Sequence, residues 1–130
     1  MGMKLLVVDD SNVIRNKISR TIHIANVEVV GTAKNGREAV SMFAKFRPEL
    51  VTMDITMPEM DGIQCIREVI KLRTDSLVLV ISALADKATA IEALKQGAHG
   101  FLCKPFSDRE LNEAMKELIR GAQEAGHGHG

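Results

Sequence analysis

Three carboxylate side chains stand at the ends of short apolar segments in this sequence. Asp9 and Asp10 follow the apolar residues 4–8, and Asp54 ends the segment of residues 50–54. Because open parallel sheets bind their ligands at the carboxyl ends of the strands, we expect the three carboxylates to share one pocket. A carboxylate in such a pocket can act as a nucleophile. We predict that Asp54 is the reactive group.

Two further apolar segments bring a hydroxyl group and an ammonium group to the same edge. Residues 77–81 are followed by Ser82, and residues 100–103 are followed by Lys104. Three carboxylates in one pocket repel one another, and one lysine with one divalent ion would bring the total charge to zero. Oxygen ligands without His or Cys favour Mg²⁺. The sequence therefore predicts a magnesium site.

The spacing of the apolar residues predicts five strands that alternate with five helices. The strands are expected at residues 4–8, 27–31, 50–54, 77–81 and 100–103. Unbroken runs of Val, Leu and Ile are typical of parallel strands that are buried on both faces. Such an alternation requires right-handed crossovers. The predicted fold class is therefore α/β, a doubly wound parallel sheet covered by helices on both sides.

The segments between the strands carry apolar residues at helical spacing. The fourth helix is expected to bury Ala88, Ile91 and Leu94 on one face. The fifth helix is expected to begin with the capping box of residues 107–110 and to end at residue 121. These helices would cover the sheet and leave its carboxyl edge open.

The residues at the strand ends resemble the motifs of a known family, the receiver domains of bacterial two-component response regulators. The motifs are Asp9-Asp10, Asp54 with residues 57–62, Ser82-Ala83 and Lys104-Pro105-Phe106. The likeness spans roughly residues 4–119 and is most similar to the stand-alone chemotaxis (CheY-like) type. It implies a flavodoxin-like (βα)5 sheet with strand order 2-1-3-4-5. A receiver domain would occupy residues 1–121, and residues 122–130 would be a disordered or artificial tail.

The resemblance implies a phosphoacceptor with a bound metal ion. Asp54 would accept a phosphoryl group from a histidine kinase. Mg²⁺ would be bound by Asp10, Asp54 and the backbone carbonyl of Thr56, with Asp9 acting partly through water. The chain would not be an enzyme, beyond slow self-phosphorylation from small donors and self-dephosphorylation.

The resemblance also implies how phosphorylation is transmitted. Lys104, the Ser82 hydroxyl and the Ala83 N–H would bind phosphoryl oxygens, and the peptide bond before Pro105 would be cis. Phe101 would then turn inward. This change would alter the face made by the fourth helix, the fifth strand and the fifth helix, which would bind an output partner such as a flagellar switch component.

Three residues depart from the proteobacterial chemotaxis type. Those proteins typically have tyrosine at the position of Phe101, asparagine at that of Thr56 and an acid at that of Leu84. Phe101 can still change rotamer but offers no hydroxyl to a partner, which argues against a flagellar-motor interface of that type. Because Leu84 cannot orient a water molecule, we predict slow self-dephosphorylation.

These residues bear on three alternative interpretations. An aspartate-nucleophile phosphatase needs an acid two residues after the nucleophile, where this chain has Thr56. A flavodoxin-like electron carrier would bind a phosphate after its first strand, where Asp9 and Asp10 would repel it. The third alternative stays open: the chain could be a receiver domain taken from a larger regulator with a DNA-binding or enzymatic output domain. The expected end of the fifth helix favours the stand-alone type.

Length and charge exclude further classes. The chain has 130 residues, which is the length of one domain. Its 17 basic and 17 acidic residues cancel, so bulk electrostatics favour neither nucleic acid nor an anionic membrane surface. The apolar segments are too short to span a membrane, and no signal peptide is evident. We therefore expect a cytoplasmic monomer without nucleic acid or membrane insertion.

Overall fold

A parallel β-sheet runs through the centre of the molecule in this computed structural model, which describes residues 2–22, 24, 26–55, 62–73, 75–83 and 87–128. The described strands form one five-stranded sheet in the order β2-β1-β3-β4-β5, and all neighbouring strands are parallel. The strands are β1 (Met3–Val8), β2 (Val27–Ala33), β3 (Leu50–Met53), β4 (Leu77–Ser82) and β5 (Gly100–Cys103). The predicted fold class and strand order are confirmed.

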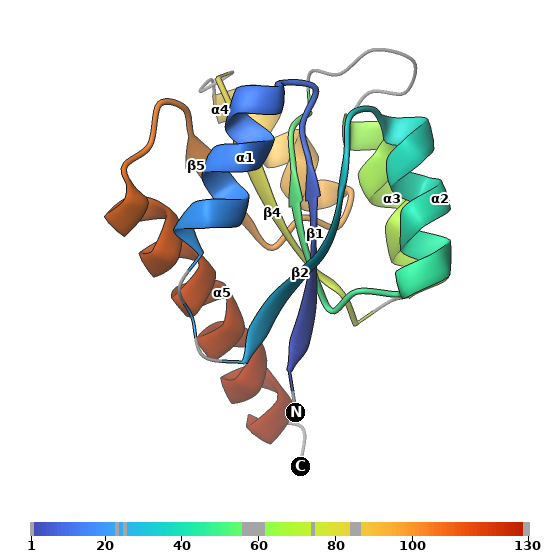
Figure 1. The fold of residues 1–130 in the computed structure, drawn as a ribbon. Helices are drawn as coiled ribbons and strands as arrows, with labels where there is room; N and C mark the ends of the chain where they lie inside the picture. The colour runs from blue at the N-terminus through green and yellow to red at the C-terminus, as the bar shows by residue number, and fades with distance from the viewer. Residues whose placement is uncertain are drawn as a thin grey trace.

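Helices cover both faces of this sheet. They are α1 (Asn12–Thr21), α2 (Gly36–Phe46), α3 (Gly62–Leu72), α4 (Lys87–Lys95) and α5 (Asp108–Gly128). Figure 1 shows α1 and α5 on one face and α2 and α3 on the other. The buried Ala93 places α4 in the same core layer as α2 and α3.

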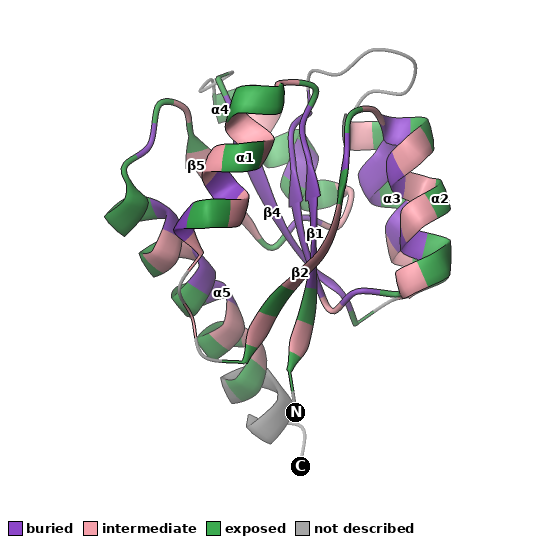
Figure 2. Cartoon of the chain, viewed as in Figure 1, coloured by how far each residue is buried: buried purple, intermediate pink, exposed green. Residues whose placement is uncertain are grey.

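The core consists of two layers, one on each face of the sheet. Successive strand residues alternate between them: Leu6 and Val8 belong to the layer under α2 and α3, whereas Leu5 and Val7 belong to the layer under α1 and α5. The central strands β3 and β4 and most of β1 are accordingly buried, whereas the edge strands β2 and β5 are mostly intermediate. Figure 2 shows this contrast between β4 and β2, and it shows that the outer faces of the helices are exposed. This arrangement explains why the strands read as unbroken apolar runs rather than as alternating ones.

The predicted capping box begins α5. The Ser107 hydroxyl accepts the Glu110 N–H (3.0 Å), and the Glu110 carboxylate accepts the Ser107 N–H (2.8 Å). The end of this helix differs from the prediction, because α5 continues from Gly121 to Gly128. Ala122 packs against the core layer under α1 and α5, which gives the helix an apolar contact beyond the predicted boundary. Within the described residues, no helix is both long and apolar enough to cross a membrane.

The prediction for the buried face of α4 is wrong. Ala93 is fully buried, whereas Ile91 is 43% exposed and Leu94 is 49% exposed. Ala88 is exposed as well. The small Ala93 side chain lets the helix pack closely, and the larger apolar side chains of α4 point away from the sheet.

His99 precedes β5 and extends the hydrogen bonding of the sheet beyond the strand. Its Nδ1 accepts the Val78 N–H (3.1 Å), and its own N–H donates to the Val78 carbonyl (2.8 Å). Partial burial lowers the pKa of His99 from its usual value of 6.5. A protonated Nδ1 could not accept the Val78 N–H.

This arrangement predicts a pH dependence of stability. Because the folded state binds a proton on His99 less readily than the unfolded state, the contribution of His99 is complete above pH 6.5 and decreases as the pH falls below it. Urea unfolding of the wild type and of His99→Gln should show a stability difference that shrinks on acidification. A difference that does not change with pH would contradict this assignment.

Candidate functional site

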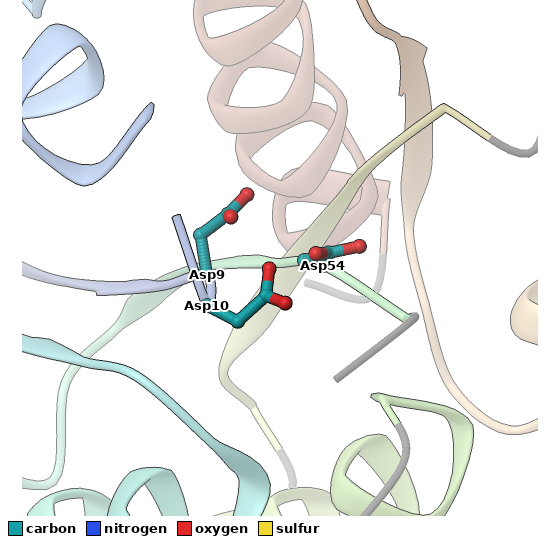
Figure 3. A group of neighbouring side chains, drawn as sticks. All are labelled: Asp9, Asp10 and Asp54. Carbon is teal, nitrogen blue, oxygen red and sulfur yellow. The ribbon is translucent and has the colours of Figure 1, made fainter. Parts of the chain in front are cut away.

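The three predicted carboxylates meet at the carboxyl edge of the sheet. Asp9 and Asp10 follow β1 and Asp54 follows β3, and these strands are neighbours. Main-chain pairing continues into the site, since the Asp54 N–H donates to the Val8 carbonyl (3.0 Å). Figure 3 shows the three side chains side by side. Among the described residues, these three form a group whose ligand oxygens all lie within 4.8 Å of one another.

Two of these carboxylates are removed from solvent. Asp9 is 1% exposed and Asp54 is 2% exposed, whereas Asp10 is exposed at the mouth of the site. Burying ionised carboxylates is costly unless a cation accompanies them. The Lys104 Nζ lies 2.7 Å from Asp9 Oδ2 and 3.6 Å from Asp54 Oδ2. The predicted lysine is therefore the counter-ion of both buried acids.

Helix α1 and its preceding turn hold Asp9 in place. The Ser11 N–H donates to Asp9 Oδ1 (2.9 Å), and Arg15 Nη1 donates to the Asp9 main-chain carbonyl (2.8 Å). The Ser11 hydroxyl also caps α1 by accepting the Ile14 N–H (3.3 Å). Sequence reasoning did not identify Arg15. The signal in the sequence was the position of Arg15 one turn after the cap of α1. A side chain there lies close to the end of β1, from which Asp9 comes.

The donor set fits a hard divalent cation. Lys104 neutralises one of the three carboxylate charges, and two negative charges are left for a metal ion. The group offers carboxylate oxygens without His or Cys, which suits Mg²⁺. The exposed Asp10 gives access from solvent. Thr56, the fourth predicted ligand, lies outside the described residues, so its role stays a prediction.

The other predicted residues lie at the end of β4 and in the segments that follow β4 and β5. Ser82 is buried at the end of β4, and its carbonyl accepts the Lys104 N–H (2.9 Å). Ala83 follows and is exposed. The peptide bond between Lys104 and Pro105 is cis, as the resemblance implied.

Phe101 does not belong to the carboxylate pocket. It is half-buried on β5 and packs against the core layer under α2, α3 and α4. It also lines a cavity of about 230 Å³, together with His99 of the β5 approach and Glu117 of α5. Phe101 is therefore separate from the residues that would react.

The pocket can support nucleophilic chemistry on an anionic electrophile. A buried carboxylate such as that of Asp54 can act as a nucleophile, and the Lys104 ammonium nearby can attract negatively charged oxygens of a reacting group. Phosphoryl groups carry such oxygens, and their transfer depends chiefly on positioning and on charge stabilisation.

Comparisons with known proteins agree with this chemistry. The sequence model for the response regulator receiver domain matches residues 5–116. The chemotaxis protein CheY of Thermotoga maritima is 43% identical, covering 92% of this chain and all of the relative. A protein-glutamate methylesterase/protein-glutamine glutaminase of Archaeoglobus fulgidus is 40% identical, covering 95% of this chain but 36% of that protein. The structure of a CheX-CheY-BeF3-Mg²⁺ complex from Borrelia burgdorferi is similar, with a TM-score of 0.85, 28% identity, and coverage of 90% of this chain and 89% of that chain.

Proposed function

The chain belongs to the family of response regulator receiver domains, and on this premise we propose that Asp54 accepts a phosphoryl group from the histidine kinase of a chemotaxis pathway. Its CheY relatives support the coarser statement that it is a phosphorylation-activated two-component response regulator. The observation that carries the finer proposal is the position of the Lys104 ammonium between the buried carboxylates of Asp9 and Asp54.

The proposed reaction is a transfer between two nucleophiles. A carboxylate oxygen of Asp54 attacks the phosphorus of a phosphohistidine, a new O–P bond forms, and the P–N bond breaks with its electron pair staying on the imidazole. The Lys104 ammonium attracts the phosphoryl oxygens and orients them. When bound by Asp9, Asp10, Asp54 and the Thr56 carbonyl, Mg²⁺ would supply the remaining positive charge.

The proposed output is a change of the face formed by α4, β5 and α5. The Ser82 hydroxyl and the Ala83 N–H would bind a phosphoryl oxygen and draw the segment after β4 toward the site. Phe101 would then turn inward. The exposed Ile91 and Leu94 of α4 support the idea that this face binds a protein partner.

The proposal predicts that phosphorylation depends on Mg²⁺. Incubation with acetyl phosphate and Mg²⁺ should add the mass of one phosphoryl group to the intact protein, with acetate as the leaving group. Excess chelator should prevent the gain, because the phosphoryl oxygens then lack their main counter-charge. An equal gain with and without chelator would contradict the assigned metal site.

A second candidate function is suggested by the methylesterase relative. This chain is 40% identical to a protein of which it covers 36%, so the same domain also occurs in longer regulators. The phosphoacceptor chemistry would be unchanged, and the effector would be a covalently attached domain. Binding of the beryllofluoride-loaded chain to flagellar switch proteins would favour the chemotaxis output, and the absence of such binding would favour the second candidate.

The phosphoryl group is expected to persist for minutes rather than seconds. Leu84, which lies outside the described residues, cannot orient water in the way that an acid at this position could. Replacing it by Glu should shorten the lifetime by about tenfold, while Leu72→Glu at an exposed position of α3 should have no effect. The lifetime in each protein is measured from the decay of the phosphorylated mass after the donor is removed. A wild-type lifetime of seconds would refute the expectation.

A further inference from the structure

Lys17 lies on the face of α1 that packs toward the sheet. Ile18 and Thr21 are buried on this face, and Ile14 is half-buried there. Lys17 shares the face because it stands three residues after Ile14 and four before Thr21, and it is itself half-buried. A lysine on a core-facing stripe is uncommon, because its ammonium must find partners or reach water.

The Lys17 ammonium contacts Phe106 in two ways. Its Nζ donates to the Phe106 main-chain carbonyl (2.7 Å) and lies 4.5 Å from the centroid of the Phe106 ring. Phe106 is 4% exposed and belongs to the core layer under α1 and α5. A carbonyl and an aromatic face together provide an ammonium with electrostatic partners without a carboxylate.

These contacts anchor the segment that carries Lys104. At one end of residues 104–106, the Lys104 N–H donates to the Ser82 carbonyl (2.9 Å). At the other end, the Phe106 carbonyl is bound by Lys17. The Lys104 side chain leaves the backbone between these two anchors and places its ammonium 2.7 Å from Asp9 Oδ2.

Helix α1 also fixes the chain that follows this segment. The Thr21 hydroxyl donates to Asp108 Oδ1 (3.4 Å), and Asn112 Nδ2 donates to the Thr21 carbonyl (2.9 Å). The start of α5 is thus tied to α1 independently of Lys17. Loss of Lys17 would remove the hydrogen bond to the Phe106 carbonyl, and with it one anchor of the backbone of residues 104–106, while α5 stays in place.

We propose that Lys17 is a positioning residue for phosphoryl transfer, which fixes residues 104–106 so that the Lys104 ammonium faces Asp54. This inference rests on the proposed function of Asp54. Its physical basis is that a small displacement of a charge-stabilising group lowers the rate of transfer strongly. Lys17 itself touches neither Asp9 nor Asp54 in the described contacts; it acts through the backbone of Phe106.

The kinetics of single and double variants test the proposal. Lys17→Met should lower the rate constant of phosphorylation by acetyl phosphate about tenfold at saturating Mg²⁺. Lys17→Arg keeps a donor and a positive charge and should restore most of the rate. Arg20→Met removes one charge from an exposed position of the same helix and should leave the rate within about twofold. In a Lys104→Met background, Lys17→Met should have no further effect.

A second readout does not require phosphorylation. Under native conditions, acylation of lysine amines followed by peptide mass analysis should show Lys104 reacting about tenfold faster in Lys17→Met, relative to the exposed Lys71 in the same sample. Arg20→Met should leave this ratio unchanged. If the wild type takes up no phosphoryl group, the proposed function fails. The ratio of the acylation rates of Lys104 and Lys71 still decides in that case whether Lys17 positions Lys104. An unchanged ratio in Lys17→Met, or an equal rate loss in the Lys104→Met background, would overturn the inference.

Discussion

Asp54→Asn should abolish phosphorylation of this protein. The amide oxygen of asparagine is a far weaker nucleophile than a carboxylate, so the rate of phosphoryl uptake from acetyl phosphate should fall at least about a hundredfold. The variant should stay folded, because the substitution is nearly isosteric and removes one of two buried acidic charges beside Lys104. Uptake is measured by intact mass at saturating Mg²⁺.

Asp75→Asn provides the matched control for this loss. Asp75 is an exposed acid that pairs with Arg73 (2.8 Å), and this pairing lowers its pKa. It stands just before β4, at the end of the sheet opposite the carboxylate pocket. The control should be phosphorylated at the wild-type rate. Rapid phosphorylation of Asp54→Asn would show that another residue is the acceptor.

Lys104→Met should destabilise the protein by about 3 kcal/mol in the absence of divalent cations. The substitution keeps the length of the side chain but leaves the buried carboxylates of Asp9 and Asp54 without their ammonium partner. Urea unfolding in the presence of chelator measures the loss. Lys71→Met removes an exposed lysine that pairs with Glu68 on the surface (3.5 Å), and it should change stability by less than about 0.5 kcal/mol.

Mg²⁺ should stabilise the Lys104→Met variant more than the wild type. In the variant, the metal ion would no longer compete with an ammonium for the carboxylates, so it should bind more tightly and raise the free energy of unfolding further. Unfolding curves at several Mg²⁺ concentrations compare the two proteins. A variant that is as stable as the wild type without Mg²⁺ would contradict the role of Lys104 as counter-ion.

The polar residues of the site could be predicted because each lies at or just after the end of a strand. Main-chain pairing between neighbouring parallel strands determines where each strand ends, so residues such as Asp9, Asp54 and Lys104 are brought to one edge by the fold itself. Their types then indicate the chemistry. The sequence also places Asp10 in the pocket. It could not show that Asp10 is exposed, because the alternation of side chains between the two faces of the sheet does not continue into a turn.

The side chains that position the site were harder to predict. Arg15 and Lys17 bind the main-chain carbonyls of Asp9 and Phe106, and a main-chain carbonyl leaves no signature of residue type in the sequence. A lysine within the core-facing stripe of α1 was a signal, but it did not reveal the partner. The role of His99 was hard to predict for the same reason, because the partner of its imidazole is the main-chain N–H of Val78.

The buried face of α4 could not be predicted for a different reason. Apolar spacing identifies a face that is suited to burial, but it does not state whether the sheet or another molecule covers that face. In α4 the sheet takes Ala93, and Ile91 and Leu94 are left exposed. The error therefore falls on the surface that we propose for the output partner.

The most direct test of the central claim is to locate the phosphoryl group. Borohydride reduces an aspartyl phosphate to homoserine, which marks the acceptor permanently and can be found by peptide mass analysis. After treatment with acetyl phosphate and Mg²⁺, the described chemistry predicts homoserine at position 54 and nowhere else. Homoserine at position 9 or 10, or modification of a residue outside the carboxylate pocket, would contradict the assignment of Asp54 as the phosphoacceptor.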